Sequence, residues 1–289
     1  MKNQENTTMS PPSLTPPRIG ETPGLVPAIE KLDAILEFLA EREHGATITQ
    51  TSVALELPKS TVHRILGTLE HLGYVELSDG AGMYRLGYKL LMLSRRVNHN
   101  QSLLRVARPA LAGLVEQTRE TAKLNVVQGL SACVVDRIES SAEMKISVVV
   151  GAVFPIYAGA ASRLLLAHLP EPMRRQILGG PLTQFTETTL ADRDALSRSL
   201  EAARARGYTF DNEECVRGIS ALACPVMDFT GEAIAAISVP FIANTKTESM
   251  LQEILRLLAD ACRSVSLALG CPPDAYPSIR WVGTDPFTA

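Results

Sequence analysis

The spacing of apolar residues predicts three helices in the N-terminal part of the chain. From Val26 the apolar positions recur three and four residues apart, with acidic residues between them, a pattern typical of a helix with one buried stripe. Gly45 ends this region, and Pro58 separates two further periodic stretches at about 49–56 and 59–72. The residues expected to face inward from the first two helices are Ile29, Leu32, Leu36, Leu39, Val53, Ala54 and Leu57.

A β-hairpin is predicted directly after the third helix. Residues 74–77 and 83–86 have the pattern of two short strands, and a Gly- and Asp-rich turn separates them. Three helices and a hairpin within about 65 residues match the size and order of a winged helix-turn-helix, in which the hairpin is the wing.

The rest of the chain alternates between strand-like and helical stretches. Apolar runs typical of strands fall at 122–128, 132–138, 146–150, 219–227 and 233–239. Helical patterns fall at 161–169, 171–179, 189–206 and 247–269. Strands mixed with helices predict an α+β domain on one central sheet.

These patterns predict five segments. A Pro-rich arm, which cannot bury enough apolar surface to fold, precedes the winged helix-turn-helix, a linker helix, the α+β domain and an irregular tail. Trp281 in the tail either docks on the α+β domain or is exposed. The expected bounds are 1–24, 25–87, 88–102, 103–270 and 271–289.

The third helix carries the candidate DNA-reading surface. Val62, Leu66 and Leu69 share its apolar stripe, and a short polar stripe lies opposite. An arginine there can bind guanine through two hydrogen bonds, and a helix N-terminus attracts phosphate. The alternatives are a solvated helix face and, in the wing, a strand-end aromatic beside a surface cation. The candidate DNA contacts are Lys59, Ser60, Thr61, His63, Arg64, Tyr84 and Arg85.

The net charge limits how this surface can bind DNA. The whole chain carries −3, and residues 25–94 hold six Lys and Arg against nine Asp and Glu. Strong non-specific binding needs many cations that neutralise phosphates. We therefore expect weak non-specific binding and an affinity that depends on a few placed groups, helix N-termini and dimerisation.

Catalytic and metal-binding patterns are missing from the sequence. The five cysteines form no CxxC pair and no zinc-spaced cluster with histidine, and GxSxG, HExxH, GxxxxGK[ST] and GxGxxG are absent. We expect reduced, buried cysteines, no cofactor and no enzymatic activity, with a hydrolase-like α+β domain as the enzyme alternative. The chain lacks a long apolar run and an apolar leader, so a cytoplasmic protein without membrane contact is expected.

Two separated stretches resemble the IclR family of bacterial transcription regulators. The first comprises AIEKLDAIL (28–36), LPKSTVHRIL (57–66), LGYV (72–75) and YRLG (84–87). The second comprises GYTFDNEE (207–214), GISALACPV (218–226) and AAISV (235–239). The resemblance implies a GAF-like effector-binding domain, dimers that often pair into tetramers, and control of a nearby catabolic operon by a small carboxylate, aromatic acid or sugar acid.

The resemblance also implies an effector pocket. Small residues near the predicted start of a helix at Ala161 would leave room for an anion at the helix N-terminus, and Asp211 and Ser238 would supply hydrogen bonds. Tight helix packing, a turn residue and a backbone hydrogen bond are the respective alternatives. The family's usual Gly-Lys is replaced here by Ser162-Arg163. The implied pocket residues are Ile146, Ala160, Ala161, Asp211, Ile219, Ala221 and Ser238.

The sequence therefore predicts a ligand-responsive regulator that binds double-stranded operator DNA as a homodimer or tetramer. Its expected effector is a small carboxylate or an aromatic acid. The alternative is a protein–protein interaction module in which the winged helix contacts a partner and the sensor-like domain is structural.

Overall fold

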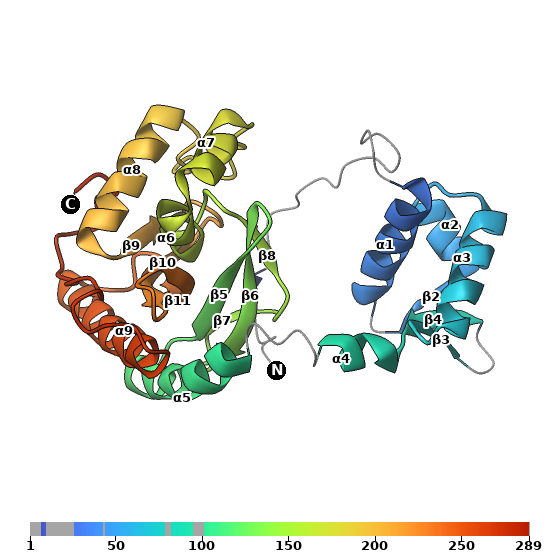
Figure 1. Cartoon of the computed structure of the whole chain (residues 1–289), viewed down its shortest axis with the longest axis horizontal. Coiled ribbons are helices and arrows are strands. Elements are labelled where there is room, and N and C mark those ends of the chain that lie inside the picture. The colour runs from blue at the N-terminus through green and yellow to red at the C-terminus, as the bar shows by residue number, and fades with distance from the viewer. Residues whose placement is uncertain (1–6, 10–25, 43, 79–81, 95–100, 289) are drawn as a thin grey trace. The chain divides into compact units, whose positions relative to one another are not determined.

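The structure, a computed structural model, describes residues 7–9, 26–42, 44–78, 82–94 and 101–288. The chain divides into two compact units (Figure 1). Residues 15–99 form the winged-helix unit, and residues 1–14 with 100–289 form the α+β unit. Each unit has its own apolar core.

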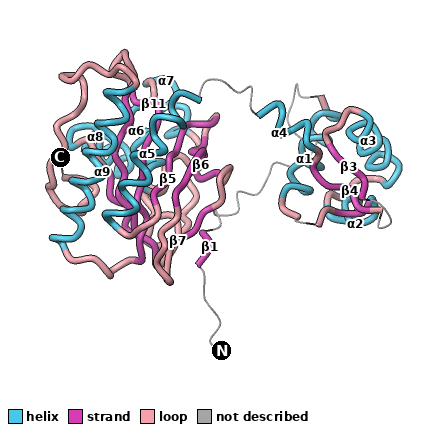
Figure 2. Tube along the Cα trace, turned by 90° about the horizontal axis from the view of Figure 1, so that it is seen from below, coloured by secondary structure: helices cyan, strands magenta, loops and turns pink. Residues whose placement is uncertain are grey.

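The winged-helix unit packs three helices against a small sheet (Figure 2). The sheet has the strand order β2-β4-β3. Its elements are α1 (Pro27–Ala40), β2 (Ala46–Thr47), α2 (Ile48–Ala54), α3 (Lys59–His71), β3 (Val75–Ser78), β4 (Met83–Leu86) and α4 (Tyr88–Ser94). This is the predicted order of three helices and a hairpin, with a short additional strand before α2.

Local hydrogen bonds explain the start of α2 and the turn to α3. The backbone N–H of Gln50 donates to Thr47 Oγ1 at 3.2 Å, and the Thr47 N–H donates to Gln50 Oε1 at 2.8 Å, which is a capping box. Glu56 takes a left-handed conformation with φ of 53°. The Ser52 hydroxyl donates to the Leu57 carbonyl at 2.6 Å. These bonds close the turn that leads into α3.

The expected inward face of α2 is wrong. Val53 is 73% exposed and Ala54 is also exposed, whereas Leu57 is buried. Helix α2 ends at Ala54, so Leu57 reaches the core from the turn and shares no helical face with the other two. Ile29 in the first predicted stripe is likewise exposed, at 62%.

The α+β unit is built on one six-stranded antiparallel sheet with the order β8-β6-β5-β11-β10-β9. Its strands are β5 (Ala122–Gln128), β6 (Ser131–Ile138), β8 (Val153–Pro155), β9 (Thr209–Asn212), β10 (Ile219–Met227) and β11 (Ala233–Ile242). β8 and β9 were not among the expected strands, because three or four residues are too few to show an alternating pattern.

Helices cover both faces of this sheet (Figure 1). α5 and α9 pack on one face, and α6 packs on the other with α7 and α8 beyond it. The helices are α5 (Gln101–Thr118), α6 (Ala160–His168), α7 (Glu171–Gly179), α8 (Arg193–Arg206) and α9 (Glu248–Ala268). The central strands are therefore buried on both sides.

The ends of the α+β unit differ from the expected arm and linker. Thr7–Met9 form β1, which pairs in parallel with β7 (Ile146–Val148) outside the main sheet. The prediction of an unstructured arm is wrong at these three residues, since the edge of a strand offers backbone groups that pair regardless of side chain. The other arm residues lie outside the described part of the chain. In the expected linker, α4 and α5 occupy the two ends, and residues 95–100 lie outside the described part.

The C-terminal tail docks on the α+β unit. Residues 271–288 contain no helix or strand. The Trp281 ring nevertheless stacks on Tyr208 with 6.0 Å between ring centroids. The Tyr208 hydroxyl donates to the Gly283 carbonyl at 2.8 Å, and Arg206 Nη1 donates to the Asp285 carbonyl at 2.7 Å. Trp281 is thus docked, and it is the single tryptophan of the chain.

Candidate functional site

Helix α3 separates a buried apolar side from an exposed polar side. Val62 and Leu66 are fully buried in the core of the winged-helix unit, and Leu69 is 1% exposed. The polar candidates lie on the other side or at the helix start: Lys59, Ser60, His63 and Arg64 are exposed, and Thr61 is half-buried.

The N-terminus of α3 has no side-chain cap. The N-cap residue is Pro58, whose carbonyl accepts the backbone N–H groups of Thr61 at 2.9 Å and Val62 at 3.1 Å. The first-turn N–H groups of a helix attract anions, because they and the helix dipole place partial positive charge there. The start of α3 is therefore chemically suited to a DNA phosphate.

The two wing candidates lie in different surroundings. Tyr84 is only 7% exposed and belongs to the core of the winged-helix unit. It sits on β4, the central strand of the small sheet, where alternate residues face the helices. Its ring is therefore part of the core, and a DNA contact by Tyr84 stays a prediction. Arg85 is exposed and lies 3.4 Å from Glu76 across the hairpin.

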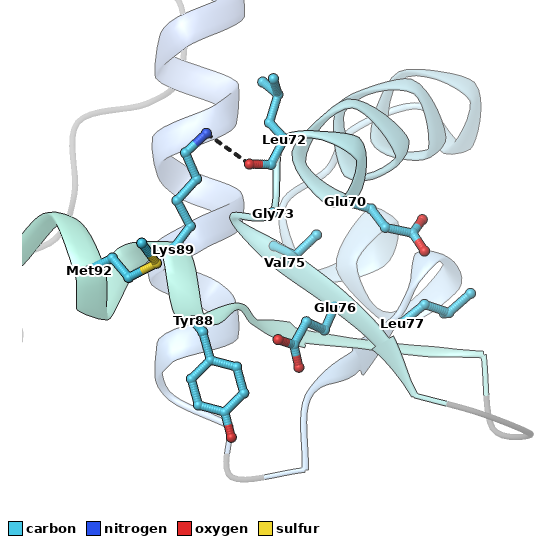
Figure 3. A pocket seen from close by; sticks show the side chains of 9 residues that line it. All are labelled: Glu70, Leu72, Gly73, Val75, Glu76, Leu77, Tyr88, Lys89 and Met92. Carbon is cyan, nitrogen blue, oxygen red and sulfur yellow. Dashed lines mark hydrogen bonds between the residues drawn. The ribbon is translucent and has the colours of Figure 1, made fainter.

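The winged-helix unit also has a surface hollow between α3, β3 and α4 (Figure 3). It is open to solvent and has a volume of about 630 Å³. Lys89 Nζ donates to the Leu72 carbonyl at 2.8 Å, and Glu70 and Glu76 line the same hollow (Figure 3). With its cation held by a backbone carbonyl and two carboxylates present, this hollow suits DNA poorly.

The α+β unit contains a small cavity between the sheet and the start of α6. Its open space is about 30 Å³, roughly the room that one water molecule takes. The cavity brings together six of the seven residues expected in an effector pocket: Ala160, Ala161, Asp211, Ile219, Ala221 and Ser238. The seventh, Ile146, is not among the residues that line this space. It is 2% exposed and packs in the same apolar core as Ala160 and Ala161.

Strand register explains why a space remains there. Ala221 on β10 pairs with Asp211 on one side and Pro240 on the other. Ala223 pairs with Ser238, which pairs in turn with Lys123 on β5. The small side chains of Ala221 and Ser238 thus lie between Asp211 on β9 and Lys123 on β5. They leave a space between the sheet and α6.

Lys123 and Asn125 line the cavity, and sequence reasoning missed both. Asn125 Nδ2 donates to Ser238 Oγ at 3.0 Å and to the Ala236 carbonyl at 3.2 Å. Lys123 is 6% exposed, and burial lowers the pKa of its ammonium to about 8. The sequence signal that could have found them is a lysine and an asparagine two residues apart in the mostly apolar strand AKLNVVQ (122–128). Two residues apart in a strand, they share one face of the sheet.

Asp211 lies at the opposite side of the cavity, next to the start of α6. Its Oδ1 accepts the Glu214 N–H at 2.7 Å. Burial and the nearby Glu214 charge raise the pKa of Asp211 to about 7. Gly159 precedes α6 with φ of 91°, and a Cβ there would lie 3.6 Å from Asp211 Oδ2. A glycine is therefore required for this conformation, and it keeps the carboxyl close to the helix start.

The departure from the family pattern at Ser162-Arg163 has a structural consequence. Arg163 is fully buried, and its Nε lies 2.8 Å from Glu214 Oε2. Its other two nitrogens donate to the Phe210 carbonyl and to the Ser199 hydroxyl. A planar guanidinium makes these contacts in three directions, which an ammonium group would not reproduce.

The described residues offer no metal-ion site and no disulfide. No group of three or more His, Cys, Asp and Glu side chains could hold a metal ion among the described residues. The five cysteines are buried and unpaired. No helix among the described residues is long and apolar enough to cross a bilayer.

Comparison with known proteins identifies the two units. The model of the IclR helix-turn-helix domain matches residues 28–79, and the model of the bacterial transcriptional regulator IclR C-terminal domain matches residues 95–267. The chain belongs to the IclR family. It is thus a DNA-binding transcription regulator with a helix-turn-helix domain and an effector-binding domain, as the resemblance in the sequence indicated.

Relatives of this IclR-family chain extend over most of its length. The HTH-type transcriptional repressor AllR of Klebsiella pneumoniae is 31% identical over 249 residues, which are 86% of this chain and 92% of that protein. An IclR regulator structure from Alicyclobacillus acidocaldarius matches with a TM-score of 0.73 at 25% identity, over 85% of this chain and all of that one. An IclR homologue from Microbacterium hydrocarbonoxydans, solved with 4-hydroxybenzoate, shares the fold with a TM-score of 0.74 at 24% identity, over 84% of this chain and 98% of that one.

Replacing Tyr84 tests its place in the core. We expect Tyr84→Ala to lower the unfolding free energy of the winged-helix unit by about 3–5 kcal/mol, because it removes a buried aromatic ring. Tyr84→Phe should keep the stability, because it retains the buried ring. Hydrogen exchange of the α3 amides, followed by mass spectrometry, measures the stability. Unchanged exchange in Tyr84→Ala would contradict the buried position.

The lowered pKa of Lys123 predicts a pH-dependent stability. Between about pH 8 and 10.5, unfolded Lys123 holds more protons than the folded residue, so the unfolding free energy rises with pH. Across this range the rise should be on the order of 3 kcal/mol larger in the wild type than in Lys123→Met. Urea titrations followed by Trp281 fluorescence report on the α+β unit. Parallel pH profiles of the two proteins would contradict the burial of a charged lysine.

Proposed function

We propose that this regulator binds operator DNA through α3 and that a small organic acid in the α+β cavity controls this binding. The cavity itself is the observation that carries the proposal. Polar side chains of Asp211, Asn125 and Ser238 surround an open space inside the core. Buried polar groups cost free energy unless they are hydrogen-bonded, so such a space favours a small polar ligand.

The α3 surface supports the DNA part of the proposal. Its exposed side places Ser60, His63 and Arg64 next to an uncapped helix start. An arginine of this kind can read guanine in the major groove while the helix N-terminus holds a phosphate. Two such helices in a dimer would read two related half-sites. A ligand that binds one orientation of the domains better than another would then shift operator affinity.

Exposed apolar residues on α4 support self-association. Tyr88 is 73% exposed, Met92 is 65% exposed and Leu93 is 44% exposed. Clustered apolar side chains on a surface often mark an interface, and most soluble oligomers are symmetric homo-oligomers. We propose that α4 takes part in a homodimer, with tetramers as the next level of assembly.

A catabolic operon is the proposed target. Family resemblance supports this choice, together with the polar side chains that line the cavity. Sequencing the neighbouring genes and footprinting their upstream regions test it, since the operator should lie beside genes for the metabolism of the acid.

A protein–protein interaction module is the second candidate function, and the charge of residues 25–94 favours it. Residues 25–94 carry three more acidic than basic side chains, and two of the acids line the open hollow beside α4 (Figure 3). Footprinting at low salt separates the candidates. A protected palindrome supports the operator-binding regulator, and the complete lack of a protected site would favour the interaction module.

Replacing Arg64 tests the reading helix. We expect Arg64→Ala to weaken specific operator binding by about 1–3 kcal/mol, the value of a bidentate guanine contact. Lys31→Ala, which removes a cation from α1, is the matched control and should retain the wild-type affinity. Fluorescence anisotropy with the footprinted operator gives both values. Equal affinities for Arg64→Ala and the wild type would remove Arg64 from the contact surface.

Replacing Asp211 tests the cavity. Asp211→Asn keeps an oxygen for the Glu214 N–H but removes the carboxylate charge. A thermal-shift screen of small carboxylic and aromatic acids first finds an acid that stabilises the wild type. We expect the variant to need at least roughly tenfold more of this acid for the same change in operator binding, with unchanged operator affinity when no acid is present. A full response at the wild-type concentration would refute the assignment.

A further inference from the structure

Gly67 is an unusual residue for the interior of the reading helix. It is the ninth of the 13 residues of α3, and glycine is among the least favourable residues inside a helix, because it loses the most backbone freedom on folding. The helix nevertheless continues past it: the Thr68 hydroxyl donates to the Arg64 carbonyl at 2.8 Å, and the Leu72 N–H donates to the Thr68 carbonyl at 3.0 Å. Gly73, with φ of 80°, ends the helix, so Gly67 is not needed for that purpose.

Neither backbone conformation nor packing inside the winged-helix unit explains Gly67. At Gly45 a Cβ would lie 2.2 Å from the Tyr84 carbonyl oxygen, and at Gly87 it would lie 2.5 Å from another backbone oxygen. Gly67 has an ordinary helical conformation, and a Cβ built on it meets no atom within 4 Å among the described residues. An alanine would therefore fit the folded unit and favour the helix.

Gly67 lies in the middle of the candidate DNA-reading surface. With 3.6 residues per turn, its direction from the helix axis differs by about 20° from that of Ser60. It falls between the directions of His63 and Arg64, which are both exposed, and the buried stripe of α3 faces the other way. The polar stripe thus has one point, a turn after His63 and Arg64, where only backbone faces outward.

We propose that Gly67 sets how closely operator DNA approaches α3, and so determines which bases His63 and Arg64 can reach. A base edge in the major groove lies against the bare helix backbone at Gly67, where a side chain would act as a spacer. Close approach matters because residues 25–94 carry three more acidic than basic side chains, so long-range attraction to phosphates is weak. This inference rests on the proposed operator binding by α3 and adds a positioning residue to it.

The test uses variants with increasing side-chain size at this position. The wild-type protein first selects a duplex from a randomised pool, and fluorescence anisotropy then gives the affinity of each variant for it. We expect Gly67→Ala to weaken binding roughly 5- to 150-fold, as the loss of one bidentate base contact would. Gly67→Leu should weaken it further. Affinity for a scrambled duplex at low salt should stay within about twofold, because non-specific binding depends on phosphate contacts.

The stability of the variants separates close approach from damage to the fold. Amides of α3 should exchange hydrogen roughly fivefold more slowly in Gly67→Ala than in the wild type, since alanine is the better helix former. Gly113→Ala is the matched control. Gly113 lies inside α5, and the nearest described atom to its Cβ position is Gln117 Nε2 at 4.0 Å. This control should leave the affinity for the selected duplex unchanged.

A double-mutant cycle tests whether Gly67 acts through Arg64. In the Gly67→Leu background, Arg64→Ala should change the affinity by less than about twofold, because a displaced helix no longer brings Arg64 to a base. Additive losses in the double variant would overturn the positioning role. Wild-type affinity in both Gly67→Ala and Gly67→Leu would overturn the whole proposal.

Arg64→Ala measured alone separates this inference from the proposed function. If Arg64→Ala loses affinity and the two Gly67 variants keep it, α3 reads the operator and the role of Gly67 is wrong. If all three variants lose affinity for the selected duplex and keep it for the scrambled one, both are supported. If the wild type selects no duplex from the pool, operator binding and the role of Gly67 fail together.

Discussion

The buried ion pair between Arg163 and Glu214 is the interaction on which the cavity of the α+β unit depends. It joins the first turns of α6 to the loop after β9. The same loop carries the Glu214 N–H that holds Asp211, and the Arg163 guanidinium also binds the Phe210 carbonyl. Breaking a buried pair by removing one partner leaves an uncompensated charge and is strongly destabilising. The position of Asp211 beside α6 is therefore coupled to the packing of the whole helix.

This arrangement links ligand chemistry to the framework of the domain. α6 is buried along nearly its whole length and packs on both the sheet and α8. The proposed ligand at its N-terminus would therefore contact a central element of the domain. Close-packed interiors transmit small displacements, because they deform little within one arrangement. A regulator of this kind needs two arrangements with different affinities for the ligand and for DNA. The charged residues around the cavity are the groups whose interactions a ligand would change.

Much of this fold could be predicted from the sequence, and the failures have physical causes. Periodicity located α3, α6, α8, α9 and the long strands, because their apolar positions repeat many times. It did not locate β8 and β9, which are too short to show a period. It also assigned Val53 to the buried face together with Leu57, although α2 ends between them and only Leu57 is buried.

The site was predicted less completely than the fold. The family resemblance pointed to six residues that do line the cavity, and to Ile146, which packs in the same core without lining the open space. Lys123 was missed because a strand pattern marks which face a residue takes and says nothing about what covers that face. Only the packing of α6 above β5 and β11 shows that this lysine is buried and lines the cavity.

We propose that acid binding in the cavity and operator binding by α3 are coupled. Calorimetry with one acid, titrated into the free protein and into the operator-bound protein, measures this coupling directly. The ratio of the two acid affinities must equal the ratio of operator affinities with and without saturating acid. We predict that both ratios differ from one by the same factor, on the order of 5- to 150-fold. Identical acid affinities for free and operator-bound protein would contradict the central claim.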